Sequence, residues 1–195
     1  MTLIRVKGRG AENVGRRNLI INGAMQIAQR GTVTGVGASS AVAYGGADRY
    51  QFARGGSAVV SLSKDTDVPT AQGFTSSQKV DVTTSSDMSG SGNYAMIRQK
   101  IEGQNLQHLL YGTSNAKKVT LQFWVKSAKT GIHVVELYHG DVNYFNNIQY
   151  TIASANTWQK VTATFDGYQP TALDNNNGIG FQLAWWLGAS TTYNS

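Results

Sequence analysis

The sequence predicts an all-β fold, and three observations support this prediction. Glycine is abundant (22 residues) and proline scarce (2), and serine, threonine and asparagine are dense between short apolar stretches, which is typical of many short strands joined by polar turns. Several segments alternate apolar and polar residues with the two-residue period of a strand. Only segment 102–110 (EGQNLQHLL) has helical spacing, through Leu106, Leu109 and Leu110, and it predicts one short helix.

The predicted elements follow one another within a single domain. Residues 1–17 (MTLIRVKGRGAENVGRR) have no useful periodicity, and we expect them to form an extended basic arm that orders on a partner surface. Residues 18–195 are expected to form a β-sandwich, which the resemblance described below implies is a jelly roll. The predicted strands are 19–21, 50–52, 58–64, 77–84, 94–101, 119–126, 132–138, 147–153, 158–165 and 178–187. About ten strands are too many for one sheet with one covered face, so they predict an antiparallel two-sheet sandwich.

Five aromatic residues are candidate ligand-binding residues. Alternation in 119–126 puts Leu121 and Phe123 on a dry face and Trp124 on a wet face. An exposed flat ring beside hydrogen-bonding side chains suits the face of a sugar. In the pairs 144–145, within the predicted loop 141–146, and 185–186, one ring must point outward if the other is core. The predicted glycan-contacting residues are Trp124, Tyr138, Tyr144, Trp158 and Trp186. The alternative is that these rings pack under loops or against a neighbouring subunit.

Most of the net charge of +6 comes from the first 30 residues. Six basic residues and one acidic residue lie there: Arg5, Lys7, Arg9, Arg16, Arg17, Arg30 and Glu12. The remainder of the chain is close to neutral, so we expect no specific nucleic-acid partner. No run of 18 apolar residues is present, and we expect no membrane insertion.

The sequence gives little support to catalysis or metal binding. Cysteine is absent. His133 and His139 would lie roughly 20 Å apart on one strand, too far to share an ion. Glu136 with Asp141 is the best carboxylate pair for a glycosidase, but neither is placed by a motif. No nucleophile elbow or phosphate loop occurs. We therefore predict no catalytic residues, no metal site and no cofactor.

Six phrases in order carry a family resemblance. They are NLIINGAMQIAQRG (18–31), ADRYQF (47–52), NYAMIRQKIEG (93–103), VTLQFWVKSAKTG (119–131), NTWQKVTATF (156–165) and WWLGAS (185–190). Together they resemble a family of bacteriophage tail-fibre or virion-associated structural proteins, whose body is a jelly roll like that of carbohydrate-binding modules. Similar chains continue beyond Tyr193, so we expect the last strands of the sandwich to be missing here or supplied by a neighbouring subunit.

The resemblance implies a non-enzymatic structural protein of the phage particle, assembled in the host cytoplasm. It would be a fibre or spike subunit, a homotrimer whose body contacts host surface glycans. Other tail or head proteins would hold its arm through Arg5, Lys7, Arg9, Arg16 and Arg17. Two alternatives stay open. One is a head-decorating fibre with the same fold. The other is a carbohydrate-binding module of an exported glycan-degrading enzyme, which would need a signal peptide or a linked catalytic domain.

Overall fold

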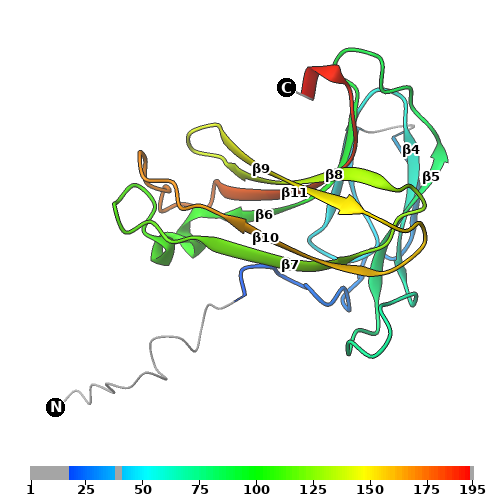
Figure 1. Ribbon diagram of the computed structural model, residues 1–195, viewed down its shortest axis with the longest axis horizontal. Coiled ribbons are helices and arrows are strands. Elements are labelled where there is room, and N and C mark those ends of the chain that lie inside the picture. Colours follow the sequence, from blue (N-terminus) through cyan, green and yellow to red (C-terminus); the bar gives the residue numbers. More distant parts are fainter. Residues whose placement is uncertain (1–17, 38–40, 194–195) are drawn as a thin grey trace.

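The computed structural model describes residues 18–37 and 41–193, which form antiparallel β-sheets and three 3₁₀ turns (Figure 1). The strands are β1 (Val33–Val36), β2 (Val42–Tyr44), β3 (Gln51–Gly55), β4 (Val59–Asp65), β5 (Ser77–Thr84), β6 (Tyr94–Glu102), β7 (Val119–Val125), β8 (Gly131–His139), β9 (Tyr144–Ile152), β10 (Gln159–Phe165) and β11 (Ile179–Ala189). The prediction of an all-β sandwich is confirmed. No helix within these two ranges is long and apolar enough to cross a membrane.

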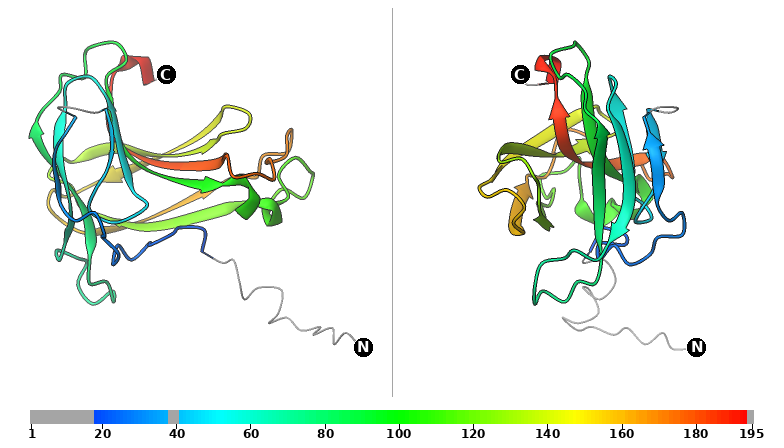
Figure 2. Two further views of the ribbon diagram at one scale, coloured as in Figure 1. Left: turned by 180° about the vertical axis from the view of Figure 1, so that it is seen from behind. Right: turned by 90° about the vertical axis from the view of Figure 1, so that its right-hand side faces the viewer.

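The sandwich has one large sheet and a second layer in two parts. The large sheet has six strands in the order β2-β3-β6-β11-β8-β9. The second layer consists of a three-stranded sheet, β1-β4-β5, and a two-stranded sheet, β10-β7. The strands β4 and β5 run in a different direction from β7 and β10, as the views in Figure 2 show. The large sheet therefore twists enough to be covered by both parts.

Two hydrophobic clusters fill the space between the layers. The first joins Leu137 and Phe181 of the large sheet to Phe165 of β10. The second joins Phe52 of the large sheet to Leu62 of β4. Trp185 of β11 packs against both clusters. Because successive strand residues point to opposite faces, this buried set fixes which side chains lie on the other face of the large sheet.

The segment 19–21 is not a strand, and this prediction was wrong. Its backbone is bound by a side chain: the Ile21 N–H donates to Oε1 of Gln99 (2.8 Å), and Nε2 of Gln99 donates to the Ile21 carbonyl (2.9 Å). Asn22 then turns the chain with a positive φ of 56°. Ile20 contacts both hydrophobic clusters. The amide of Gln99 therefore takes the place of a neighbouring strand.

Other predicted boundaries also shift. The strands β1 and β2 were not predicted because each is very short and lies among glycine and serine residues. Residues 144–146, predicted as a loop, begin β9. The predicted helix 102–110 is two 3₁₀ turns, η1 (Gly103–Asn105) and η2 (Gln107–Leu109), and ends at Leu110, whose φ is 57°. A third 3₁₀ turn, η3 (Thr191–Tyr193), follows β11.

Gly103, the last residue of the phrase 93–103, allows two segments of backbone to approach closely. A Cβ atom at this position would lie 2.2 Å from the carbonyl oxygen of Asp174, and a Cβ at Gly180 would lie 2.6 Å from the Gly103 Cα. Only glycine permits this approach. The end of β6 therefore packs directly against the chain that leads into β11.

Candidate functional site

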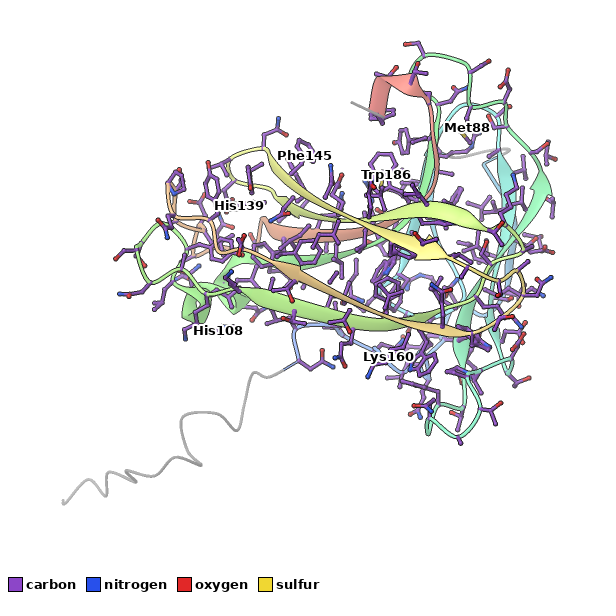
Figure 3. All side chains as sticks on the ribbon, in the orientation of Figure 1. Met88, His108, His139, Phe145, Lys160 and Trp186 are labelled. Atoms are coloured by element: carbon purple, nitrogen blue, oxygen red, sulfur yellow. The ribbon has the colours of Figure 1, made fainter. Side chains whose placement is uncertain are left out.

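The five predicted aromatic residues lie in three places. Trp124 lies opposite Lys160 in the β7–β10 pair. Tyr138 and Trp186 lie on the large sheet. Figure 3 shows Trp186 and Phe145 on one side of the sandwich and Lys160 on the other. The predicted anchoring residues Arg5, Lys7, Arg9, Arg16 and Arg17 lie outside the described residues.

Trp158 packs under a loop, as the alternative interpretation of these rings has it. Its indole N–H donates to Oδ1 of Asp67 (2.9 Å), in the β4–β5 loop, and Lys126 lies 5.7 Å from its ring centroid. Lys126 also forms an ion pair with Asp67. The hydrogen bonds from Lys126 and Trp158 lower the pKa of the Asp67 carboxyl. Trp158 thus joins the two parts of the second layer.

Tyr144 lies at one end of the core. It faces His139 across the β8–β9 pair, and its ring is 4.5 Å from that of Tyr168. His139 is buried, and burial lowers its pKa, although Asp141 (3.6 Å from Nε2) opposes the shift. The space these residues surround has a volume of about 10 Å³, too small for a sugar. Asp141 therefore belongs to this end of the core and does not accompany Glu136.

The second face of the large sheet carries polar and aromatic side chains beside a small buried apolar cluster of Ala53, Met96 and Ala184. We call this face the outer face. Strand register places five residues in one row across it, one on each of five strands: Gln51, Arg98, Ala184, Glu136 and Asn147. A neighbouring row contains Lys100, Gln182, Tyr138 and Phe145, and the row on the other side contains Ala53, Met96, Trp186, Val134 and Gln149. No strand within residues 18–37 and 41–193 covers this face (Figures 1 and 2).

The central row combines opposite charges with a small residue between them. Nε of Arg98 donates to Oε1 of Gln51 (2.8 Å), which fixes the guanidinium. Ala184 lies between Arg98 and Glu136, and it is buried in a small apolar cluster with Ala53 and Met96. Among the described residues, no ion pair joins Arg98 to Glu136. Arg98 is half-buried and so partly accessible to a ligand, whereas Glu136 is almost fully buried.

Three polar side chains of this face are buried although no strand within the described ranges covers it. Glu136 is 4% exposed, and Gln51 and Gln182 are also buried. Burial raises the pKa of Glu136, and the indole N–H of Trp186 partly opposes this shift. The same indole nitrogen is buried and makes no hydrogen bond of good geometry. Buried polar groups are normally hydrogen-bonded, so the indole N–H of Trp186 has unused hydrogen-bonding capacity.

Aromatic rings lie in the two rows that flank the polar row. Trp186 packs with Tyr94 and Tyr193, with ring centroids 5.9 and 5.4 Å away. Two rows further along the strands, Tyr138 and Phe145 are stacked at 4.7 Å. Because rows on one face are about 7 Å apart along a strand, the two aromatic groups lie roughly 13 Å apart. Rings on either side of fixed donors and acceptors can bind an extended, hydroxyl-rich ligand.

Most of the polar residues of this face were not predicted as site residues. Glu136 was considered only as an acid for hydrolysis. The alternation in β6 contained the signal, since Ala95, Ile97 and Ile101 form the core side and Arg98 lies on the opposite side. No group of three or more histidine, aspartate or glutamate residues within the described ranges could hold a metal ion.

The geometry defines the class of the protein as an antiparallel β-sandwich, and a solved structure contains a similar fold. The chain is similar to the enzymatically active domain of tailspike protein 4 of bacteriophage CBA120, with a TM-score of 0.50 and 16% identity over 86% of this chain. It spans 20% of that tailspike chain. It is also similar to the tandem CBM22 domain of Xyn10C from Paenibacillus barcinonensis, with a TM-score of 0.40 and 13% identity, covering 74% of this chain and 39% of the other. A comparison with protein-family models and with curated proteins gave no match.

Proposed function

We propose that the chain is a non-enzymatic structural protein of a phage particle, a fibre or spike subunit that binds a surface glycan through the outer face of its large sheet. One observation carries the binding proposal: Gln51, Glu136 and Gln182 are buried polar residues on a sheet face that no strand within the described ranges covers. The two larger hydrophobic clusters pack on the opposite face, and the small cluster of Ala53, Met96 and Ala184 on this face contains no polar side chain.

Glycan recognition would divide between two kinds of contact. The rings of Trp186 and Phe145 would stack on the apolar faces of sugars, while Arg98 would donate to hydroxyl oxygens and the Glu136 carboxylate would accept from hydroxyl groups. Each charge-assisted hydrogen bond contributes about 1.5–3 kcal/mol. Trp124 and Trp158, which lie on the second layer, are outside this surface.

The placement in a phage particle rests on resemblance. The six sequence phrases resemble phage virion proteins, and a bacteriophage tailspike protein contains a domain of this fold. Residues 1–17 would attach the subunit to another virion protein, and three copies would associate. Peptides of the chain should be detected in purified particles by mass spectrometry, and native mass spectrometry of the full chain should give a trimer. Absence of the peptides, or a monomer at high concentration, would contradict these parts of the proposal.

The binding proposal is tested on an array of neutral and acidic oligosaccharides, followed by calorimetric titration of the glycans that bind. The exposed ring of Phe145 (50% exposed) can be truncated without opening the core. Phe145→Ala should weaken binding by about 0.5–1.5 kcal/mol. Glu136→Gln should weaken it by about 1.5–3 kcal/mol.

Val82→Ala, an exposed apolar truncation on β5, is the matched control and should leave affinity unchanged. The proposal fails if the wild-type chain binds no glycan. It also fails if both outer-face variants bind as the wild type does.

A further inference from the structure

An open hollow of about 410 Å³ lies at one end of the outer face. Its lining comes from five separate segments and includes Arg30, Tyr44, Arg49, Lys100, Glu102 and the residues 177–179. Lys100 connects it to the outer face, because this residue lies opposite Gln182 in the β6–β11 pair. The volume falls within the range of about 300–1,000 Å³ typical of small-molecule sites.

The hollow is basic although the folded body is close to neutral. Three cationic side chains and one carboxylate line it. That carboxylate, Glu102, already accepts a hydrogen bond from Arg49 (3.3 Å), and Arg49 also donates to the carbonyl of Lys100 (3.2 Å). Arg30 forms a long ion pair with Asp48, at 3.8 Å. The positive charge is therefore only partly neutralised.

Lys100 is the least compensated of these cations. Within the described residues it has no ion pair. Burial lowers the pKa of its ammonium group, and the charge of Arg98 lowers it further. An anion beside Lys100 would remove both penalties, because it would favour the charged form of the lysine.

The walls of the hollow also offer apolar surface. The ring of Tyr44 is 41% exposed, and the guanidinium of Arg30 lies 5.3 Å from its centroid. Ile179, which also lines the hollow, is exposed. A free inorganic anion would use the cations alone, whereas a sugar with an anionic substituent would use both the cations and the ring.

We propose that this hollow binds an acidic sugar, with its carboxylate or phosphate group at Lys100 and Arg30 and its ring against Tyr44. This inference rests on the proposed function and adds that the glycan is anionic. The acidic sugar would be the terminal or branching unit of a chain whose neutral units lie along the outer face.

The test is an NMR titration of the isotope-labelled full chain at constant ionic strength, with glucuronate, glucose 6-phosphate, glucose and inorganic phosphate as probes. Glucuronate or glucose 6-phosphate, or both, should shift the amide signals of Lys100, Gly178 and Ile179, while glucose should not. The two acidic probes distinguish a carboxylate from a phosphate ligand. Lys100→Gln should weaken this binding roughly tenfold or more.

Lys129→Gln is the charge-matched control. Lys129 is exposed in the β7–β8 loop, which adjoins Gly131, the end of β8 far from the hollow. This variant should bind the acidic probe as the wild type does.

Four results would overturn the inference: no shift at these amides with either acidic sugar, equal shifts with glucose, equal affinity for inorganic phosphate, or equal weakening by Lys129→Gln. After any of these four results, the proposed function still holds if Phe145→Ala weakens binding of a neutral glycan. If the acidic sugars do not bind in the hollow and Phe145→Ala does not weaken binding of a neutral glycan, both proposals are rejected.

Discussion

Gln99 should be essential for holding segment 19–21 against the sandwich. Its side chain is 1% exposed and satisfies both backbone groups of Ile21. Gln99→Leu preserves approximate size but leaves the Ile21 N–H and carbonyl without these partners. Each unsatisfied buried group costs about 1–3 kcal/mol. Water can reach part of the released segment, so we expect a loss of about 2–4 kcal/mol in the free energy of unfolding.

Urea denaturation measures this loss, and hydrogen exchange locates it. In Gln99→Leu the Ile21 amide should exchange much faster than in the wild type, while amides in the middle of β11 stay protected. Gln122→Leu, at an exposed position on β7, is the control and should change stability by less than about 0.5 kcal/mol. A Gln99→Leu variant that is as stable as the wild type, with Ile21 still protected, would refute the reasoning.

Three further predictions concern single positions. Burial raises the pKa of Glu136, so its carboxyl group binds a proton more tightly in the folded state than in the unfolded state. The stability of the wild type therefore falls as the pH rises from the ordinary carboxyl pKa through the raised pKa of the folded state. Glu136→Gln should therefore be more stable than the wild type above that pH interval, and the difference in stability should shrink at lower pH. Urea denaturation across a pH series measures the two stabilities. A difference in stability that does not change with pH would contradict the prediction. Gly103→Ala should lose about 1–3 kcal/mol in denaturation because its Cβ would meet the Asp174 carbonyl, whereas Gly23→Ala, where the nearest atom is 3.4 Å away, should lose less. Trp124→Ala should leave glycan affinity unchanged in titration, and a large loss would move the binding surface to the second layer.

Local alternation predicted much of the fold but not its pairing. In β7, Leu121 and Phe123 contact the core, as their spacing indicated. Contacts between residues far apart in sequence determine which strands pair. The pairing of the strands in turn determines which side chains lie on the same face of a sheet. Tyr138 and Trp186 lie on one face because β8 pairs with β11, while Trp124 lies on a different sheet. Sequence spacing contains no comparable information.

The sequence also could not predict that a side chain would bind backbone groups in the place of a neighbouring strand. The apolar run at 19–21 looks like a strand, and only the position of Gln99 across the fold shows why it is not. The charge analysis had a similar limit. A body that is neutral on average still brings Arg30, Arg49 and Lys100 to one hollow.

The anchoring of Gln51, Glu136 and Gln182 within paired strands has a consequence for selectivity. Strand pairing on both sides holds their backbones, so their donors and acceptors cannot move far to suit a different ligand. Of two sugars that differ only in the configuration of one hydroxyl group, one would place that hydroxyl within hydrogen-bonding distance of a side chain, and the other would leave it without a partner. A mismatch costs about 1–3 kcal/mol, roughly 5- to 150-fold in affinity. A rigid sheet of this kind would discriminate between epimers that a flexible loop would accept equally.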